Sequence, residues 1–188
     1  MSYDKKARCP WLKVENQLYV DYHDQEWGRP VHDDNKLFEM LVLEGAQAGL
    51  SWETVLKKRE HYREAFENFE PEKVAGFSLA KQQKLISNPN IIRNKLKIAS
   101  AIQNAKAFIG VQNEFGSFNK YIWSFVNNKP IKNKFKSLAD YPCETGLSKA
   151  ISKDLKKRGF KFVGPTIIYA FMQAVGIVND HSVDCYLF

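Results

Sequence analysis

Apolar residues with the 3.6-residue spacing of α-helices recur along nearly the whole chain. Such segments run from about residue 36 to 48, 54 to 66, 71 to 74, 80 to 86, 92 to 108, 117 to 125, 147 to 158 and 165 to 175. Alternating runs of β-branched residues bounded by Asn-Gly or Asp-Gly turns, which indicate strands and hairpins, are missing. The sequence therefore predicts an all-α fold.

The size and composition suit an ordinary globular protein. A chain of 188 residues can form one domain or two small lobes that share a core, and 44% of the residues are apolar. No run approaches the roughly 18 consecutive apolar residues of a membrane span, and the first eleven residues hold no apolar signal-peptide core. We therefore expect a cytoplasmic protein with no membrane partner. Cys143 is expected to be an incidental or buried thiol.

The excess positive charge is confined to one region. Lysines and arginines exceed carboxylates by 28 − 21 = 7 in the whole chain. Between residues 127 and 161, ten basic residues stand against three acidic ones, so this window alone carries +7. A solvated lysine-rich surface and a surface that binds a polyanion such as DNA both explain this pattern.

One carboxylate falls on the apolar stripe of the helix that two aspartates at residues 33 and 34 can cap. Glu44 comes seven residues after Leu37 and four after Met40, so a helix that buries this stripe carries Glu44 inward. An unpaired buried charge is costly, and Glu44 therefore needs a partner or a ligand. The alternatives are an ion pair with an inner arginine and a position at the rim of a helix that ends early.

Four residues offer the donor set that zinc prefers: Cys9, His23, His181 and Cys185. The last two are four residues apart, which places both donors on one face of a helical turn. Four protein ligands leave no position for water, so such a zinc would be structural. It would join the N- and C-terminal segments and bring Trp11 and Tyr22 together. The wide spacing leaves open that each residue is a lone core side chain.

A basic turn with two glycines joins the last two expected helices. It spans residues 156–166, and the second helix begins at Pro165, a favoured first position. Backbone amides in such a turn and at the start of the next helix form an anion site that suits a DNA phosphate. Phe160, Phe162 and Val163 would pack the turn against the core. A helix–helix turn without any ligand is the alternative.

Taken together, these segments resemble the bacterial 3-methyladenine DNA glycosylase I family, within the helix-hairpin-helix glycosylases. The matching stretches are Arg8–Trp11, Tyr22–Gly28, Leu37–Met40, Leu43–Trp52, Val55–Arg59, Trp123–Asn127, Lys157–Gly164 and Val178–His181 with Cys185. The resemblance implies a helix-hairpin-helix fold, with residues 1–188 forming a single unit of two packed helical lobes. It also implies that structural zinc is bound by the two cysteines and two histidines named above.

The resemblance implies a base excision repair enzyme that hydrolyses the N-glycosidic bond of 3-methyladenine in alkylated duplex DNA. Its products would be free 3-methyladenine and an abasic site, and 3-methylguanine is a second substrate to be tested. No lysine nucleophile is evident, so we expect a monofunctional enzyme. We also expect a monomer, which suits an enzyme that scans DNA. Many helix-hairpin-helix glycosylases have a catalytic aspartate where Asn179 aligns here, and we assign no catalytic role to Asp180.

The expected base pocket consists of Glu44, Tyr22, Trp52 and Trp11. Methylation at N3 makes adenine cationic and a good leaving group, so we expect little acid catalysis. Glu44 would accept a hydrogen bond from the amino edge of the base as the catalytic residue, and Tyr22 would add a second polar contact. Trp52 would stack on the cationic ring, a cation–π contact of about 0.5–2 kcal/mol.

The expected DNA contacts are Leu50, Gly159, Lys161, Val163, Gly164 and Thr166. Leu50, in the turn before Trp52, would fill the gap left in the base stack, and core packing is its alternative. Two rival functions remain. A zinc-stabilised DNA-binding module would leave Glu44 without a role, and a metallohydrolase in which Glu44 activates zinc-bound water would need an open metal position.

Overall fold

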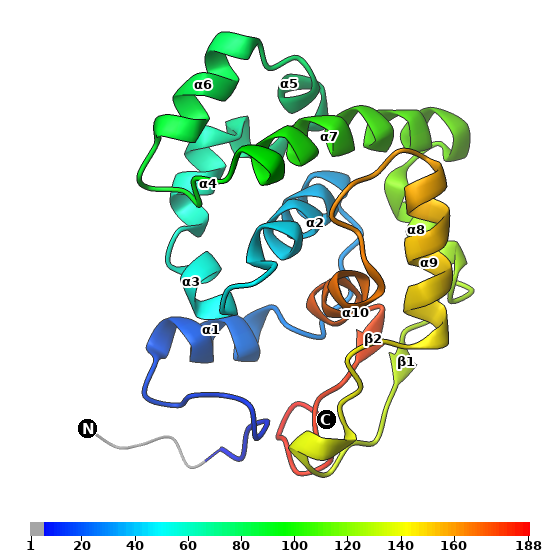
Figure 1. Cartoon of the computed structure of the whole chain (residues 1–188). Helices are drawn as coiled ribbons and strands as arrows, with labels where there is room; N and C mark the ends of the chain where they lie inside the picture. Colours follow the sequence, from blue (N-terminus) through cyan, green and yellow to red (C-terminus); the bar gives the residue numbers. More distant parts are fainter. Residues whose placement is uncertain (1–5) are drawn as a thin grey trace.

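The computed structural model describes residues 6–188 and confirms a predominantly helical fold (Figure 1). The first half contains α1 (Gln17–Gln25), α2 (Asp34–Gln47), α3 (Trp52–Leu56), α4 (Arg59–Ala65), the 3-10 turn η1 (Glu67–Phe69), α5 (Pro71–Ala75) and α6 (Leu79–Ser87). The second half contains α7 (Lys95–Phe115), α8 (Phe118–Ser124), β1 (Ile131–Lys132), η2 (Leu138–Asp140), α9 (Gly146–Lys157), α10 (Pro165–Ala174) and β2 (Val178–Asn179). Among these residues no helix combines the length and hydropathy needed to cross a membrane.

Helix α2 lies at the centre of the molecule and packs against α3, α7, α8 and α10 (Figure 1). Asp33 is its N-cap, and its side chain accepts a hydrogen bond from the backbone amide of Lys36 at 2.8 Å. Asp34 instead accepts hydrogen bonds from the backbone amides that begin α8. Every residue from 37 to 46 is buried, so the helix is enclosed on all sides and not along one stripe.

The turn between α9 and α10, residues 159–164, is called the hairpin below. It is fixed to two helices by side chains. Ser152 of α9 donates a hydrogen bond to the carbonyl of Val163 at 2.6 Å. The amide of Asn104 on α7 both donates to the carbonyl of Lys161, at 2.9 Å, and accepts from its backbone amide, at 2.7 Å. The hairpin is therefore a rigid part of the fold.

Several elements differ from the sequence-based expectation. Helix α1 was not expected, and the segment expected as one helix from 54 to 66 is interrupted at Lys57 and Lys58. Helix α7 continues to Phe115, where Gly116 ends it with φ +84°. His181 and Cys185 lie in a non-helical segment, closed by a hydrogen bond from the amide of Cys185 to the carbonyl of Ser182.

A short parallel ladder joins the basic region to the segment after α10. Ile131 pairs with Val178 and Lys132 with Asn179. Just beyond it, the side-chain amide of Asn133 donates to the carboxylate of Asp180 at 2.6 Å. The ladder therefore places the loop after β1 beside β2 and the segment that follows it.

Candidate active site and metal-binding cluster

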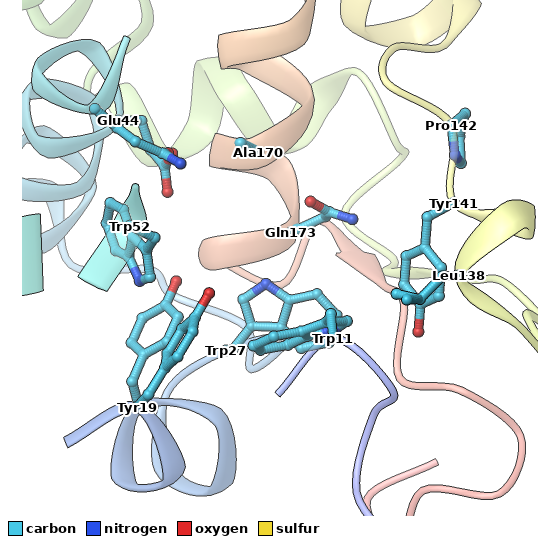
Figure 2. Close-up of a pocket in the computed structure, with 12 residues that line it drawn as sticks. Trp11, Tyr19, Trp27, Glu44, Trp52, Leu138, Tyr141, Pro142, Ala170 and Gln173 are labelled. Carbon is cyan, nitrogen blue, oxygen red and sulfur yellow. The ribbon is translucent and has the colours of Figure 1, made fainter. Parts of the chain in front are cut away.

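A pocket of about 290 Å³ contains the four side chains expected to form the base site (Figure 2). Trp11, Tyr22, Glu44 and Trp52 all line it, although they come from four different segments of the chain. The volume is close to the lower limit, about 300 Å³, of typical small-molecule sites. The structure thus brings the expected residues together around one cavity.

Glu44 is a buried carboxyl group without a protein partner. It is 4% exposed, and within residues 6–188 it makes no hydrogen bond or ion pair. Burial raises its pKa to about 8. The alternative of an inner arginine is wrong, because the buried Arg59 binds Glu26 and Glu39 instead. Helix α2 continues past Glu44 to Gln47, so a position at the rim of a short helix is also wrong.

Aromatic side chains surround this carboxyl group. The rings of Tyr22 and Trp52 have centroids 5.3 Å apart at an interplanar angle of 50°. Burial, and then the nearby charge of Glu44, raise the pKa of Tyr22, which keeps its hydroxyl protonated. Trp52 is the first residue of α3, whose N-cap Ser51 accepts a hydrogen bond from the amide of Thr54. Its buried indole N–H has no acceptor within residues 6–188.

Several other residues that line the pocket were not predicted from the sequence. Tyr19 and Trp27 flank the predicted Tyr22, and their rings pack against Trp11 at centroid distances of 5.5 and 4.8 Å. Both lie within or beside the matched stretch 22–28, which was the available signal. Tyr141 and Gln173 reach the pocket from the loop after η2 and from the end of α10, and no sequence pattern marked them.

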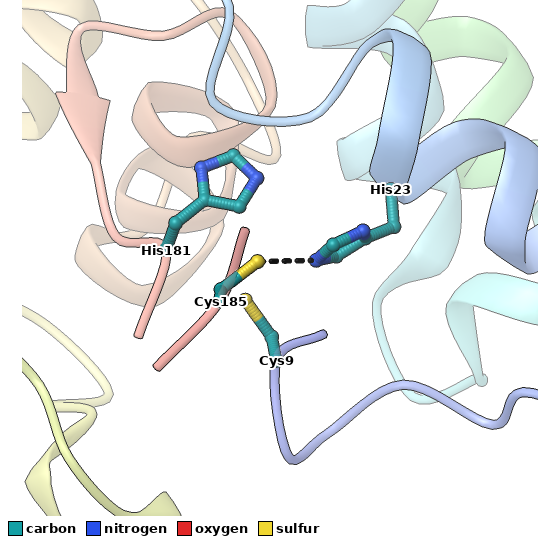
Figure 3. A group of neighbouring side chains, drawn as sticks. All are labelled: Cys9, His23, His181 and Cys185. Atoms are coloured by element: carbon teal, nitrogen blue, oxygen red, sulfur yellow. Dashed lines mark hydrogen bonds between the residues drawn. The ribbon is translucent and has the colours of Figure 1, made fainter. Parts of the chain in front are cut away.

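The four expected metal ligands form a buried cluster (Figure 3). The donor atoms of Cys9, His23, His181 and Cys185 all lie within 4.8 Å of one another. Tetrahedral zinc, with bonds of about 2.0–2.3 Å, requires donors about 3.3–3.8 Å apart. The distance between Cys185 Sγ and His23 Nε2 is 3.7 Å. The residues could therefore hold a metal ion.

The outer contacts of the two histidines also suit a metal. Nδ1 of His23 lies 2.7 Å from a carboxylate oxygen of Asp24, and Nδ1 of His181 lies 2.9 Å from the amide oxygen of Asn179. These contacts direct Nε2 of each ring inward, as is usual for metal-binding histidines. Nε2 of His181 is buried and has no hydrogen-bond partner within residues 6–188. A cation would satisfy this atom.

Leu50 lies in the turn between α2 and α3 and is 42% exposed, so its core-packing alternative is wrong. The preceding Gly49 has φ +78°, a conformation that suits glycine. The ammonium group of Lys97 donates to the carbonyls of Ala46 and Ala48 at 2.8 and 2.6 Å. The end of α2 is thereby held in place just before the exposed leucine.

Some of the residues expected to contact DNA in and beside the hairpin are exposed, and others are buried. Lys161 and Thr166 are exposed, and Gly159 has φ +90°. Val163 is 1% exposed, so only its backbone can reach a ligand, and Phe162 is partly exposed where burial was expected. No backbone acceptor or side-chain acceptor in residues 6–188 receives the amides of Val163, Gly164 and Thr166. These amides are available to an anion.

The basic charge near the hairpin is largely unpaired. Lys149 binds Glu144, and Arg158 binds Glu114 and Asp154. In contrast, four exposed lysines have no ion-pair partner within residues 6–188: Lys153, Lys156, Lys157 and Lys161. A phosphate backbone could therefore approach this surface without displacing protein carboxylates.

Comparisons with known proteins agree with this geometry. The family model of methyladenine glycosylase matches residues 11–188. A DNA-3-methyladenine glycosylase of Haemophilus influenzae is 51% identical over 179 residues, which are 95% of this chain and 96% of that protein. DNA-3-methyladenine glycosylase 1 of Escherichia coli is 51% identical over 178 residues, 95% of each chain.

Solved structures give the same result. A crystal structure of a 3-methyladenine DNA glycosylase I has a TM-score of 0.93 at 49% identity, covering 96% of this chain and 98% of that one. The Staphylococcus aureus 3-methyladenine DNA glycosylase I, studied for its recognition of 3-methyladenine, has a TM-score of 0.89 at 40% identity, covering 92% of both chains.

Proposed function

Because the chain belongs to the methyladenine glycosylase family, we propose that it excises 3-methyladenine from alkylated duplex DNA by hydrolysing the N-glycosidic bond. The observation that carries this proposal is Glu44, a buried carboxyl group without a protein partner in an aromatic pocket. Such a group needs a ligand that offers a hydrogen-bond donor or a positive charge. An N3-methylated adenine offers both.

Each of three pocket residues makes a different contact with the extruded base. The lesion weakens base stacking and pairing, so extrusion of the nucleotide costs only a few kcal/mol. Trp52 stacks on the cationic ring, and Tyr22 supplies a hydroxyl beside it. Glu44 becomes ionised when the cationic base enters, because an opposite charge lowers a carboxyl pKa. Its carboxylate then accepts a hydrogen bond from the amino group of the leaving base.

The reaction is monofunctional and leaves an abasic site. Among residues 6–188, none that lines the pocket is a lysine, so this part of the chain offers no amine to attack the sugar. Asp180 is fully buried, and both of its carboxylate oxygens already accept hydrogen bonds. It therefore does not serve as the catalytic aspartate found in related helix-hairpin-helix enzymes.

DNA binding uses the turn between α2 and α3, which holds Leu50, and the hairpin. The free amides of Val163, Gly164 and Thr166 bind a phosphate, and the unpaired lysines around Lys161 attract the backbone. Leu50 fills the space vacated by the extruded base, as apolar wedges do in other DNA complexes. This arrangement suits a monomer that engages one lesion.

A metal held by Cys9, His23, His181 and Cys185 would be structural zinc. With two thiolates and two imidazoles as ligands, such an ion would have no position left for a reactive water. It would tie the segment around Cys9 to that around Cys185 and so hold Trp11 at the pocket. The position of Glu44 argues against a metallohydrolase, because Glu44 lines the base pocket together with Trp52.

Excision is tested by incubating the protein with methylated duplex DNA in excess EDTA and identifying the released bases by chromatography. Free 3-methyladenine supports the glycosylase. Shortened strands indicate a nuclease, and binding without either product indicates a DNA-binding module. The Glu44→Gln variant should lose about ten-fold or more in kcat/KM, the value of a lost hydrogen bond to a charged group.

The matched control is Glu53→Gln on the neighbouring α3, where the carboxylate pairs with Lys57 at the surface. This variant should retain the activity of the unmodified protein. An unchanged excision rate in Glu44→Gln, with zinc content and folding preserved in both variants, would remove Glu44 from the proposed mechanism.

A further inference from the structure

Asp180 directly follows β2 and is fully buried, and both of its carboxylate oxygens accept hydrogen bonds from neighbouring side chains. One carboxylate oxygen accepts from the side-chain amide of Asn133 at 2.6 Å. The other accepts from the hydroxyl of Tyr169 at 2.5 Å and from the side-chain amide of Gln173 at 2.8 Å. In all three bonds Asp180 is the acceptor, so its oxygens are occupied by donors of the protein itself. Asp180 therefore acts on the groups that surround it and not on a substrate.

Of these groups, Gln173 is the one that reaches the pocket. Because Asp180 accepts, the amide group that faces it must be the NH₂ of Gln173, which fixes the orientation of the amide. Its carbonyl oxygen Oε1 then points the opposite way. Figure 2 shows this oxygen directed toward the side of the cavity that holds Glu44 and Trp52.

The backbone under this side chain is equally fixed. The carbonyl of Gln173 accepts hydrogen bonds from the amides of Gly28, at 2.9 Å, and Gly176, at 3.3 Å. These bonds fix the backbone at the end of α10, and the bond from Nε2 to Asp180 fixes the side-chain amide that it carries. The pocket has two preset acceptors from different helices, the carboxyl of Glu44 on α2 and the amide oxygen of Gln173 on α10.

We propose that Oε1 of Gln173, held by Asp180, accepts the second N–H of the amino group of the extruded base and selects 3-methyladenine over 3-methylguanine. This inference rests on the proposed function. The amino group at C6 of adenine has two N–H donors, one for each acceptor. Guanine has a carbonyl oxygen at C6, and its amino group is at C2.

The selectivity follows from unmatched acceptors. A carbonyl oxygen that faces Oε1 of Gln173 meets an acceptor where the adenine amino group offers a donor, and buried polar groups left unpaired lower binding strongly. Gln173 is thus a specificity-determining residue that contacts the base, and Asp180 is a positioning residue that acts through Gln173. Neither takes part in bond cleavage.

The first test replaces Gln173 with methionine, which has a similar shape but no acceptor oxygen. We expect kcat/KM for 3-methyladenine excision to fall about ten-fold or more. The ratio of 3-methyladenine to 3-methylguanine excision should fall by a similar factor, whereas affinity for a duplex with an abasic-site analogue should stay the same. The matched control is Gln112→Met on α7, which breaks a bond of the same kind, from Gln112 Nε2 to Asp34 at 2.8 Å, far along the chain from the pocket residues.

The second test exchanges the two partners. Asp180→Asn alone allows the Gln173 amide to rotate and should reduce the same selectivity ratio. The double variant Asp180→Asn with Gln173→Glu restores an N–H···O bond between the positions and leaves a carboxylate oxygen facing the pocket. It should therefore recover excision of 3-methyladenine relative to Asp180→Asn. A merely structural role of Asp180 predicts no such recovery.

The outcomes separate this inference from the proposed function. If the unmodified protein releases no 3-methyladenine, the proposed function fails. If the unmodified protein is active and Gln173→Met keeps the same kcat/KM and the same ratio of the two bases, the inference fails and the function stands. If Gln173→Met loses activity equally on both bases, the proposed role of Gln173 in selecting between them is also refuted.

Discussion

The raised pKa of Glu44 makes a prediction about stability that needs no DNA. In the folded protein the carboxyl group is 4% exposed, and Tyr19 and Tyr22 on α1 face it with Trp52 on α3. Within residues 6–188 no cation is close enough to offset the burial, and the pKa rises from 4.5 to about 8. The native state therefore keeps a proton on Glu44 at pH values where the unfolded chain has already lost it.

The sign and size follow from linkage. When the native state binds the additional proton, stability falls as pH rises. The free energy of unfolding is fully retained below about pH 4.5, declines through the interval up to pH 8, and levels off above it. At about 1.4 kcal/mol per pKa unit, the total decline is at most about 5 kcal/mol, a large share of the 5–15 kcal/mol typical of a whole domain.

The Glu44→Gln variant removes this titration. We expect its free energy of unfolding to rise relative to the unmodified protein as pH goes from 5 to 9, by up to about 4 kcal/mol. The assay is urea unfolding followed by tryptophan fluorescence at pH 5, 7 and 9, with equal zinc in all samples. Taking the difference between the two proteins cancels the other titrating groups, including His181, whose pKa burial lowers to about 4.

Two results would refute the reasoning. A difference between the two proteins that does not change with pH would mean that Glu44 titrates normally and has a partner or water that the buried geometry does not provide. A difference that changes in the opposite direction would mean that the folded protein stabilises the carboxylate. In either case the need for a cationic ligand at Glu44 would disappear.

Four further predictions follow from other parts of the structure. Gly176→Ala should destabilise the protein by roughly 3 kcal/mol or more in urea unfolding, since φ is +70° and an added Cβ would lie 2.2 Å from the backbone carbon of Arg29. Leu50→Ala should reduce both DNA bending and duplex excision, the latter about ten-fold, with unchanged binding of free 3-methyladenine; equal bending and rate would contradict the wedge. Lys161→Ala should make the negative slope of log affinity against log salt concentration shallower by about 0.9 if Lys161 contacts one phosphate. Cys185→Ser should lower both zinc content by metal analysis and Tm, and a variant with full zinc and an unchanged Tm would exclude this thiol as a ligand.

The sequence revealed those features whose cause is local. The position of Glu44 on the inner side of α2 follows from spacing within one helix, and the Asp33 cap follows from its place before that helix. The metal cluster was predictable from donor chemistry, although the expected helical turn at His181 was not needed to form it. The hairpin was identified from its glycines and the proline that begins α10.

What the sequence did not reveal depends on contacts between distant segments. Helix α1 has only three buried residues in nine and depends on the Asn16 cap and on packing, so its apolar pattern is weak. Gln173 faces the pocket because Asp180 holds its amide, and that contact exists only once the segment after α10 has folded back. The burial of Val163 likewise depends on how the hairpin packs against the helices beside it.

The metal cluster also changes how the two outer segments open. Terminal segments normally fray independently and at low cost. Here residues 9 and 185 contribute donors to the same cluster, so with an ion bound neither segment can open without giving up a ligand. Amide hydrogens of α1 and of the segment after α10 should then exchange in one shared opening event, and metal removal should split it into two. The base pocket, whose walls include Trp11 and Gln173, would thus be protected from local opening at both ends of the chain by one set of bonds.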